Sequence, residues 1–166
     1  MLAREMLGDT IVSYGDIIFD EIVLNQLLQF DGEFVLATEP NWEKSYQIRS
    51  DNPPILSDFI AIKDKQIIKF FKNSKEFLGK YNIVEYIGLM KISESTSKIL
   101  IKKFEELEKN HVGKFNYASS FKKAKIIDFL EELRRCNVEI KTQNVSGKWC
   151  EIDTKQDLEI AKKMFK

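Results

Sequence analysis

The order of apolar segments at the start of the chain constrains its fold most. Residues 10–14 form a short, nearly apolar run of mostly β-branched side chains, which predicts a buried strand. Residues 21–29 carry apolar side chains at helical spacing, with Asp20 before them as a candidate N-cap and an Asp-Gly pair after them. Residues 33–38 predict a second strand. Strand, helix and strand joined by short links predict a βαβ unit with parallel strands and a right-handed crossover.

The rest of the chain continues this α/β pattern. A polar stretch that contains all three prolines predicts a surface loop at residues 39–54. Beyond it we expect a hairpin, a strand, two long helices, two short strands and a last helix capped by Thr154. The segments before that last helix lie at residues 57–62 with 66–71, 84–92, 93–107, 120–135, 138–142 and 149–153. No repeat or linker divides the chain, so we expect one α/β domain over residues 1–166.

Composition excludes several classes of protein. The chain has 166 residues, with 26 Lys and Arg against 26 Asp and Glu, so its net charge is zero. A general nucleic-acid binder needs a basic excess, which is absent here. One histidine and two cysteines are too few for a structural zinc site or a disulfide framework. No apolar run reaches the length of a membrane span and no secretory signal pattern is present. We therefore expect a cytoplasmic protein with neither nucleic acid nor membrane as a partner.

Two further local patterns predict backbone geometry and solvent exposure. Gly88 lies inside the strand predicted at residues 84–92, which indicates a bulge or a close approach of the backbone to another group. Lys122, Lys123 and Lys125 are expected on the solvated face of their helix.

Three carboxylates are the candidate catalytic and metal-binding residues. Asp16 follows the first predicted strand, where open α/β sheets place their ligands. Glu151 and Asp153 are two positions apart in a predicted strand, so their side chains would share one face. Grouped carboxylates repel one another unless a cation lies between them, and Mg²⁺ prefers such oxygen ligands. Spacing alone leaves open the alternative that these residues only form turns or cap helices.

The polar loop at residues 39–54 offers candidate substrate ligands. Trp42 could stack on a cation or a base, although a tryptophan in such a loop more commonly anchors the loop to the core. Arg49 could hold a phosphate group bidentately, although surface charges usually have no specific partner. No nucleophilic triad can be identified, because the single His111 has no evident partners.

Taken together, four segments resemble the small-molecule nucleotidyltransferases, and they occur in the order that the family has. The first is similar to the family's strand-plus-aspartate motif, and the last to its second metal motif and closing helix. The two between them resemble the acceptor loop and a strand of the cytidylyltransferases related to choline-phosphate cytidylyltransferase and to the enzymes associated with phosphoenolpyruvate mutase. The segments are residues 11–19; Trp42, Tyr46, Arg49 and Pro54; residues 85–89; and residues 149–154 with Asp157, Leu158 and Ala161.

The resemblance implies a Rossmann-like α/β nucleotidyltransferase domain with a mixed, mostly parallel sheet. It implies Mg²⁺-dependent transfer of a cytidylyl group from CTP to a small phosphorylated or phosphonate amine, phosphocholine or 2-aminoethylphosphonate, with release of pyrophosphate. Asp16, Glu151 and Asp153 match the metal-binding positions, and Asp16 and Asp153 are the expected catalytic residues. The expected substrate-binding residues are Trp42, Tyr46, Arg49 and Tyr86.

One departure from the family pattern is the nucleotide-binding loop. The family has a glycine-rich, arginine-containing loop after its first strand, and the seven glycines of this chain are scattered instead. The chain therefore resembles the C-terminal two-thirds of such an enzyme, an N-terminally truncated fold. We expect an exposed sheet edge that favours oligomers, or a missing N-terminal segment supplied in trans. Two alternatives stay open: a sugar-1-phosphate nucleotidyltransferase, and a non-catalytic binding or assembly subunit.

Overall fold

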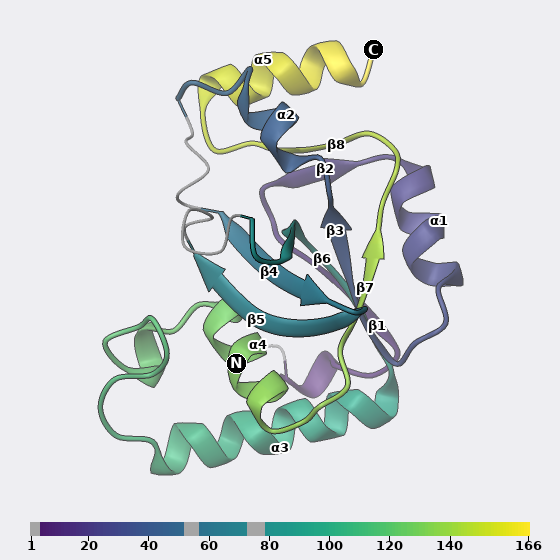
Figure 1. Cartoon of the computed structure of the whole chain (residues 1–166). Coiled ribbons are helices and arrows are strands. Elements are labelled where there is room, and N and C mark those ends of the chain that lie inside the picture. The colour runs from purple at the N-terminus through teal and green to yellow at the C-terminus, as the bar shows by residue number, and fades with distance from the viewer. Residues whose placement is uncertain (1–3, 52–56, 73–78) are drawn as a thin grey trace.

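The computed structural model describes residues 4–51, 57–72 and 79–166. Its centre is a six-stranded sheet, with a separate two-stranded sheet beside it (Figure 1). The larger sheet contains β1 (Thr10–Ser13), β3 (Phe34–Glu39), β4 (Asp58–Lys63), β5 (Gln66–Lys72), β6 (Asn82–Ile92) and β7 (Lys141–Asn144), and the smaller one β2 (Ile17–Phe19) and β8 (Trp149–Glu151). The helical segments are η1 (Arg4–Met6), α1 (Glu21–Gln29), α2 (Trp42–Tyr46), α3 (Glu94–Asn110), η4 (Phe121–Lys123), α4 (Ile126–Arg135) and α5 (Lys155–Met164).

The sheet is mixed, but the expectation that it is mostly parallel is wrong. The strand order is β5-β4-β6-β3-β7, and β1 pairs with β6. Among the described strands of this sheet, only β3 and β7 form a parallel pair, and every other neighbouring pair is antiparallel. The tight turn between β4 and β5 joins that pair antiparallel, and β6 runs opposite to each of the three strands that it pairs with, β1, β3 and β4.

The predicted βαβ unit is present in a modified form. Both β1 and β3 run antiparallel to β6, so they are parallel to one another as expected. They do not pair, because each lies opposite Ile92 on a different side of β6. The intervening segment also contains β2, which belongs to the small sheet. The local pattern therefore predicted strand direction correctly, but not the insertion of β6.

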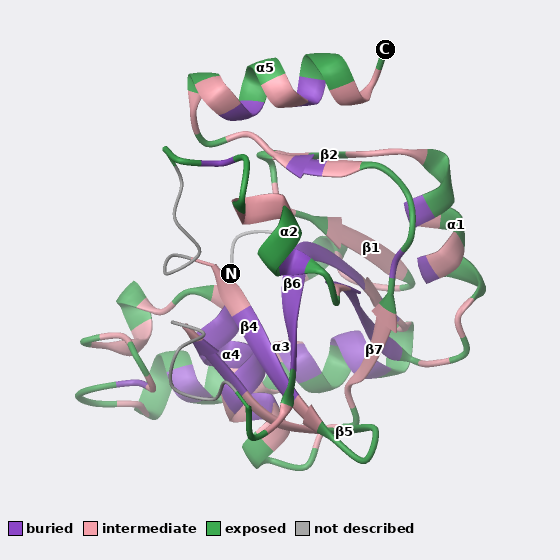
Figure 2. Cartoon of the chain, turned by 45° about the horizontal axis from the view of Figure 1, so that its top comes forward, coloured by how far each residue is buried: buried purple, intermediate pink, exposed green. Residues whose placement is uncertain are grey.

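Helices cover both faces of the large sheet (Figure 1). Alternate residues of β3 define the two sides, because successive strand residues point to opposite faces. Phe34 and Leu36 pack in a cluster with α3 and α4, whereas Val35 and Ala37 pack in a second cluster with α1. A third cluster joins Trp42 of α2 to β4, β5 and β6. Figure 2 shows that burial is concentrated on the strands between these layers, β4 and β6 above all.

The helix caps agree with the sequence pattern. The Asp20 carboxylate accepts a hydrogen bond from Val23 N at 3.1 Å and begins α1, and the Ser93 hydroxyl does the same for α3 with Thr96 N. Thr154 and Asp157 form the expected reciprocal cap of α5. No helix in the described ranges is long and apolar enough to cross a lipid bilayer.

Four segments differ from expectation. The helix expected at residues 120–135 is divided into η4 and α4, because Ala124 and Lys125 between them have extended backbone. The strand expected at 138–142 begins only at Lys141. The loop at 39–54 contains α2. Residues 17–19, which were not assigned, form β2. The predicted hairpin is confirmed as β4 and β5.

Candidate active site

The site lies where β1 ends and β4 begins, beside β6. β1 pairs with residues 89–92 of β6, and β4 pairs with residues 82–85 on the same strand. Both run antiparallel to β6, so the end of β1 meets the start of β4 and leaves a gap in the sheet beside residues 86–88. A pocket of about 450 Å³ opens at this gap, and its lining includes Tyr14, Asp58 and Tyr86.

The small sheet assembles the three predicted carboxylates at this pocket. In the β2–β8 ladder Ile17 lies opposite Glu151, and Ile152 N donates a hydrogen bond of 2.7 Å to the carbonyl of Asp16. One carboxylate oxygen from each of Asp16, Glu151 and Asp153 consequently lies within 4.8 Å of the others. The structure thus brings together all three residues that the sequence predicted as metal ligands.

Arg49 and Asp157 support this group from the protein interior. The Arg49 side chain is 5% exposed; its Nε donates to Asp157 Oδ1 at 2.8 Å and its Nη2 lies 3.4 Å from Glu151 Oε2. Asp157 is fully buried, and its other oxygen accepts hydrogen bonds from the backbone of Asp153 and Thr154. One buried ion pair therefore fixes both the Glu151 side chain and the turn that carries Asp153.

The pKa shifts reflect this arrangement. Burial and the neighbouring Asp153 carboxylate raise the pKa of Glu151, against the opposing effect of Arg49. Burial also disfavours the charged form of Asp157, but the hydrogen bonds from Arg49 and Thr154 outweigh it and lower the pKa of Asp157. A divalent cation beside Glu151 would favour its ionised form.

Gly88 shapes the same pocket by making room for Tyr14. Its φ of +81° lies in the left-handed region, and a Cβ there would lie 2.5 Å from the Tyr14 ring. Tyr14 N donates a hydrogen bond of 2.8 Å to the Gly88 carbonyl, and the Tyr14 hydroxyl donates to Asp58 Oδ2 at 3.3 Å. The prediction that this glycine marks a close approach of another group is confirmed.

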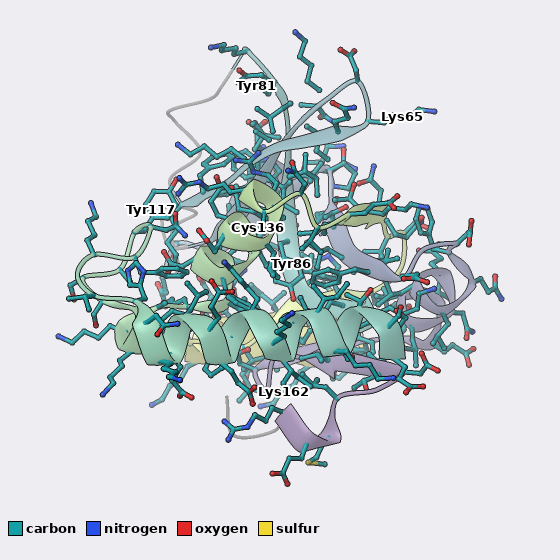
Figure 3. All side chains as sticks on the ribbon, turned by 90° about the horizontal axis from the view of Figure 1, so that it is seen from below. Lys65, Tyr81, Tyr86, Tyr117, Cys136 and Lys162 are labelled. Carbon is teal, nitrogen blue, oxygen red and sulfur yellow. The ribbon has the colours of Figure 1, made fainter. Side chains whose placement is uncertain are left out.

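Glu85 adds a buried carboxyl group from β6. The Tyr46 hydroxyl donates to Glu85 Oε1 at 2.5 Å and also contacts the Ser57 hydroxyl. Burial raises the pKa of Glu85 to about 7, even though the hydrogen bonds from Tyr46 and Ser57 favour the ionised form. Tyr86 lies next to Glu85 on the opposite face of β6, where its ring packs in the cluster with α3 and α4 (Figure 3).

The predicted substrate-binding residues differ in where they lie relative to the pocket. Tyr86 lines the pocket. Tyr46 does not line it but contacts Glu85, which does. Arg49 is committed to Asp157 and Glu151 and supports the carboxylates from behind.

Trp42 anchors its loop to the core, which is one of the two roles that the sequence left open for it, the other being stacking on a substrate. It is 7% exposed, its Nε1 donates to the Ile83 carbonyl at 3.2 Å, and its ring packs edge-on against Phe59. It does not contribute to the pocket lining. Pro54, from the same motif, lies outside the described residues.

Several pocket residues were not predicted as site residues. Asp58 and Lys72 lie at the ends of β4 and β5, and their charged groups are 3.5 Å apart. Lys125, expected on a solvated helix face, lines the pocket because the chain is extended between η4 and α4. Glu85 appeared only within a strand motif. No sequence signal separates these residues from ordinary surface charges, since only the fold brings them together.

The donor set of the three carboxylates fits Mg²⁺. Mg²⁺ takes oxygen ligands and is commonly held by one or two carboxylates together with substrate phosphates. Asp16, Glu151 and Asp153 offer such oxygens on a pocket wall that a substrate can reach, and burial together with repulsion from the other two carboxylates raises the pKa of Glu151. A larger hollow of about 880 Å³, beside β7 and the tip of the β4–β5 hairpin, contains none of these three residues in its lining.

Comparisons with known proteins point to one class of enzyme. No family model matches the chain. The CTP:phosphoglutamine cytidylyltransferase of Campylobacter jejuni is 27% identical over 154 residues, which cover 92% of this chain and 58% of that protein. In structure, the chain is similar to the inositol-1-phosphate CTP transferase from T. maritima, with a TM-score of 0.63 and 18% identity over 99% of this chain and 58% of the other. It is also similar to the CTP:phosphocholine cytidylyltransferase from Streptococcus pneumoniae, with a TM-score of 0.61 and 10% identity over 99% of this chain and 61% of the other.

These likenesses confirm the expected nucleotidyltransferase fold. The relative in sequence is named as a cytidylyltransferase, so the predicted likeness to that group is confirmed as well. The fold alone does not select the nucleotide, since the chain is also similar to a glucose-1-phosphate thymidylyltransferase from Bacillus anthracis, with a TM-score of 0.62 and 18% identity over 96% of this chain and 56% of the other. The chain spans less than two thirds of the length of each of them. The subgroup associated with phosphoenolpyruvate mutase stays a prediction.

Proposed function

We propose that this chain carries the catalytic carboxylates of a Mg²⁺-dependent cytidylyltransferase. The reaction transfers a cytidylyl group from CTP to a small phosphorylated or phosphonate amine and releases pyrophosphate. The observation that carries the proposal is the convergence of Asp16, Glu151 and Asp153 on one pocket of a nucleotidyltransferase fold. The likeness to a CTP:phosphoglutamine cytidylyltransferase over 92% of the chain supports CTP as the donor.

Asp16, Glu151 and Asp153 would hold the metal ion. When bound, Mg²⁺ supplies positive charge that neutralises the phosphate oxygens as the acceptor approaches and pyrophosphate leaves. Arg49 keeps Glu151 in place from the buried side, and Asp157 fixes the backbone of the Asp153 turn. Both supporting side chains are buried and paired with one another, which suits a reaction that depends mainly on positioning.

The acceptor needs little chemical activation in this scheme. A phosphate or phosphonate group is already anionic at neutral pH, so no general base has to remove a proton from it. This fits the pocket, whose described lining residues include neither histidine nor cysteine. Among the described residues, Lys72 and Lys125 are the cationic side chains that line the pocket, and they would counter the charge of the acceptor oxygens.

We name phosphocholine and 2-aminoethylphosphonate as candidate acceptors. The named substrate of the curated relative is phosphoglutamine, and that of one structural neighbour is phosphocholine. Both are phosphorylated compounds that carry nitrogen. The carboxyl groups of Asp58 and Glu85 line the pocket and would attract an amine.

Pyrophosphate release tests the proposal directly. The chain is incubated with Mg²⁺, CTP and either phosphocholine or 2-aminoethylphosphonate. We expect release with at least one of them, and we expect Asp153→Asn to abolish it. The matched control is Asp64→Asn, since Asp64 is an exposed turn residue whose positive φ suits asparagine. Failure to release pyrophosphate with a folded chain, or release only with sugar 1-phosphates, would contradict the proposal.

A further inference from the structure

Tyr46 and Arg49 connect two carboxylates of the pocket wall through the protein interior. Glu85 and Glu151 both line the pocket, the first from β6 and the second from β8. The Tyr46 hydroxyl donates to Glu85 Oε1 at 2.5 Å, and Arg49 Nη2 lies 3.4 Å from Glu151 Oε2. The central carbon of the Arg49 guanidinium group lies over the Tyr46 ring, 5.1 Å from its centroid. The contacts therefore run from Glu85 through Tyr46 and Arg49 to a proposed metal ligand.

The end of α2 places Arg49 against Tyr46. Arg49 N donates a hydrogen bond of 3.3 Å to the Tyr46 carbonyl, so the turn after the helix brings the two residues together. The Trp42 ring packs edge-on against the Tyr46 ring at a centroid distance of 6.4 Å, and Trp42 is anchored to β6 through its bond to Ile83. Contacts to both its ring and its hydroxyl therefore fix the Tyr46 side chain, which gives the guanidinium group a stable aromatic face to lie on.

The two carboxylate partners of Arg49 are held with different strength. Asp157 is fully buried and accepts from Arg49 Nε at 2.8 Å, whereas the contact of Nη2 with the less buried Glu151 is 3.4 Å. The longer contact is the one that orients a proposed metal ligand, so it depends more on what holds the guanidinium plane. An aromatic face attracts a guanidinium group and favours stacking of its plane. Groups that orient a metal ligand in this way also tune the affinity for the metal.

We propose that Tyr46 is a positioning residue of the metal site and acts on it through Arg49. The Tyr46 ring orients the guanidinium group that holds Glu151, and the Tyr46 hydroxyl, bonded to Glu85, keeps the ring in place. Tyr46 itself does not line the pocket, so its effect passes through its neighbours. This inference rests on the proposed function, because it takes Glu151 as a ligand of the metal ion. It gives Tyr46 a role other than the substrate binding that the sequence indicated.

Metal binding measured without nucleotide or acceptor tests this role. Mn²⁺ stands in for Mg²⁺ because it prefers the same oxygen ligands, and its titration is followed by electron paramagnetic resonance. Substitution of a group that orients a metal ligand commonly lowers metal affinity about 10- to 100-fold. Tyr46 acts one contact further away, so we expect Tyr46→Phe to weaken Mn²⁺ binding about threefold and Tyr46→Leu about tenfold. Tyr117→Phe, at an exposed position outside the pocket, is the matched control and should leave Mn²⁺ binding unchanged.

Two substitutions of Glu85 isolate its hydrogen bond with Tyr46. Glu85→Gln and Glu85→Leu remove the same charge, but only glutamine keeps an oxygen that accepts from the Tyr46 hydroxyl. We expect Glu85→Leu to weaken Mn²⁺ binding about threefold more than Glu85→Gln does, which corresponds to the loss of one hydrogen bond. The variant that combines Tyr46→Phe with Glu85→Leu should bind Mn²⁺ no more weakly than Glu85→Leu alone, because both substitutions remove the same interaction.

A purely structural role for Tyr46 gives a different result. Tyr46→Phe would then lower the free energy of unfolding in urea and leave Mn²⁺ binding by the folded chain unchanged, which overturns the inference. Equal Mn²⁺ binding by the two Glu85 variants overturns it too, as does an absence of Mn²⁺ binding by the unsubstituted chain.

The outcomes also separate this inference from the proposed function. Mn²⁺ binding that Tyr46→Phe weakens, in a chain that releases no pyrophosphate, would support the positioning role and contradict the transferase. Pyrophosphate release by a chain whose Mn²⁺ binding does not respond to Tyr46→Phe would support the transferase and contradict the positioning role.

Discussion

At the scale of single residues, Arg49 has the strongest structural effect on the candidate site. Its guanidinium group connects Asp157, which is fully buried, to Glu151 at the pocket. Arg49→Met would leave the Asp157 carboxylate buried without its cation, so we expect the free energy of unfolding to fall by about 3 kcal/mol at pH 7. Urea unfolding measures this loss. Lys98→Met, which removes one partner of an exposed ion pair, is the control and should change stability little.

The effect of Arg49→Met should also depend on pH. The pKa of Asp157 in the folded protein is lowered, so the ionised carboxylate stabilises the native chain above the ordinary aspartate pKa of about 3.9, and this stability is lost as pH falls through the folded pKa. In the variant the buried carboxyl group prefers its neutral form. The stability difference between the two proteins should therefore narrow as pH falls from 7 towards 3. A difference that stays constant would mean that Arg49 acts only through packing.

The sequence predicted some site residues and not others for a physical reason. Asp16, Glu151 and Asp153 lie beside predicted strand ends, where chain geometry concentrates functional groups, so position alone made them candidates. Glu85 lies inside a long strand, where a charged residue usually points to solvent. Its burial follows from its place in β6 between Glu39 of β3 and Phe59 of β4, where the Tyr46 hydroxyl also contacts its carboxyl group, and that place depends on the register of three strands.

At the scale of secondary-structure elements, the contact between Gly88 and Tyr14 links a bulge in β6 to the pocket. Gly88→Ala introduces a Cβ 2.5 Å from the Tyr14 ring and also strains a backbone with a φ of +81°. Each effect costs about 1–3 kcal/mol. Gly113→Ala isolates the backbone effect, because Gly113 has a φ of +88° and open space around it. Thermal or urea unfolding should show that Gly88→Ala lowers the free energy of unfolding clearly more than Gly113→Ala does. Equal reductions would show that the Tyr14 ring moves aside without a loss of stability.

The sequence correctly predicted those elements that depend on residues close together in the chain. The hairpin β4–β5 and the caps at Asp20 and Thr154 were found because turn and cap chemistry depends on neighbouring residues. The β2–β8 ladder was missed, since strands of three residues with partners far along the chain leave little periodicity. Yet this ladder brings Asp16 to Glu151, so the least predictable element positions the site.

At the scale of the whole molecule, the pairing of the strands was the main error. A run of β-branched residues indicates a strand but carries no information on its partner, so a βαβ opening suggested a mostly parallel sheet. The structure instead inserts β6 between β1 and β3, antiparallel to both. The pocket is a consequence of this topology, because β1 and β4 share one side of β6 without meeting.

The same topology leaves an edge of the sheet open. In the described part of the chain β1 pairs with β6 on one side, and no strand pairs with its other side. Unpaired backbone groups beside the half-buried Ile11 and Val12 offer a template for another strand. We therefore expect the chain to self-associate as its concentration rises, which light scattering coupled to gel filtration would detect.

Ser13→Lys places a charge at an exposed position of β1 and should shift the chain towards monomer, because lysine at an edge opposes strand pairing. A chain that is monomeric at every concentration, with or without this lysine, would show that the β1 edge is protected in another way.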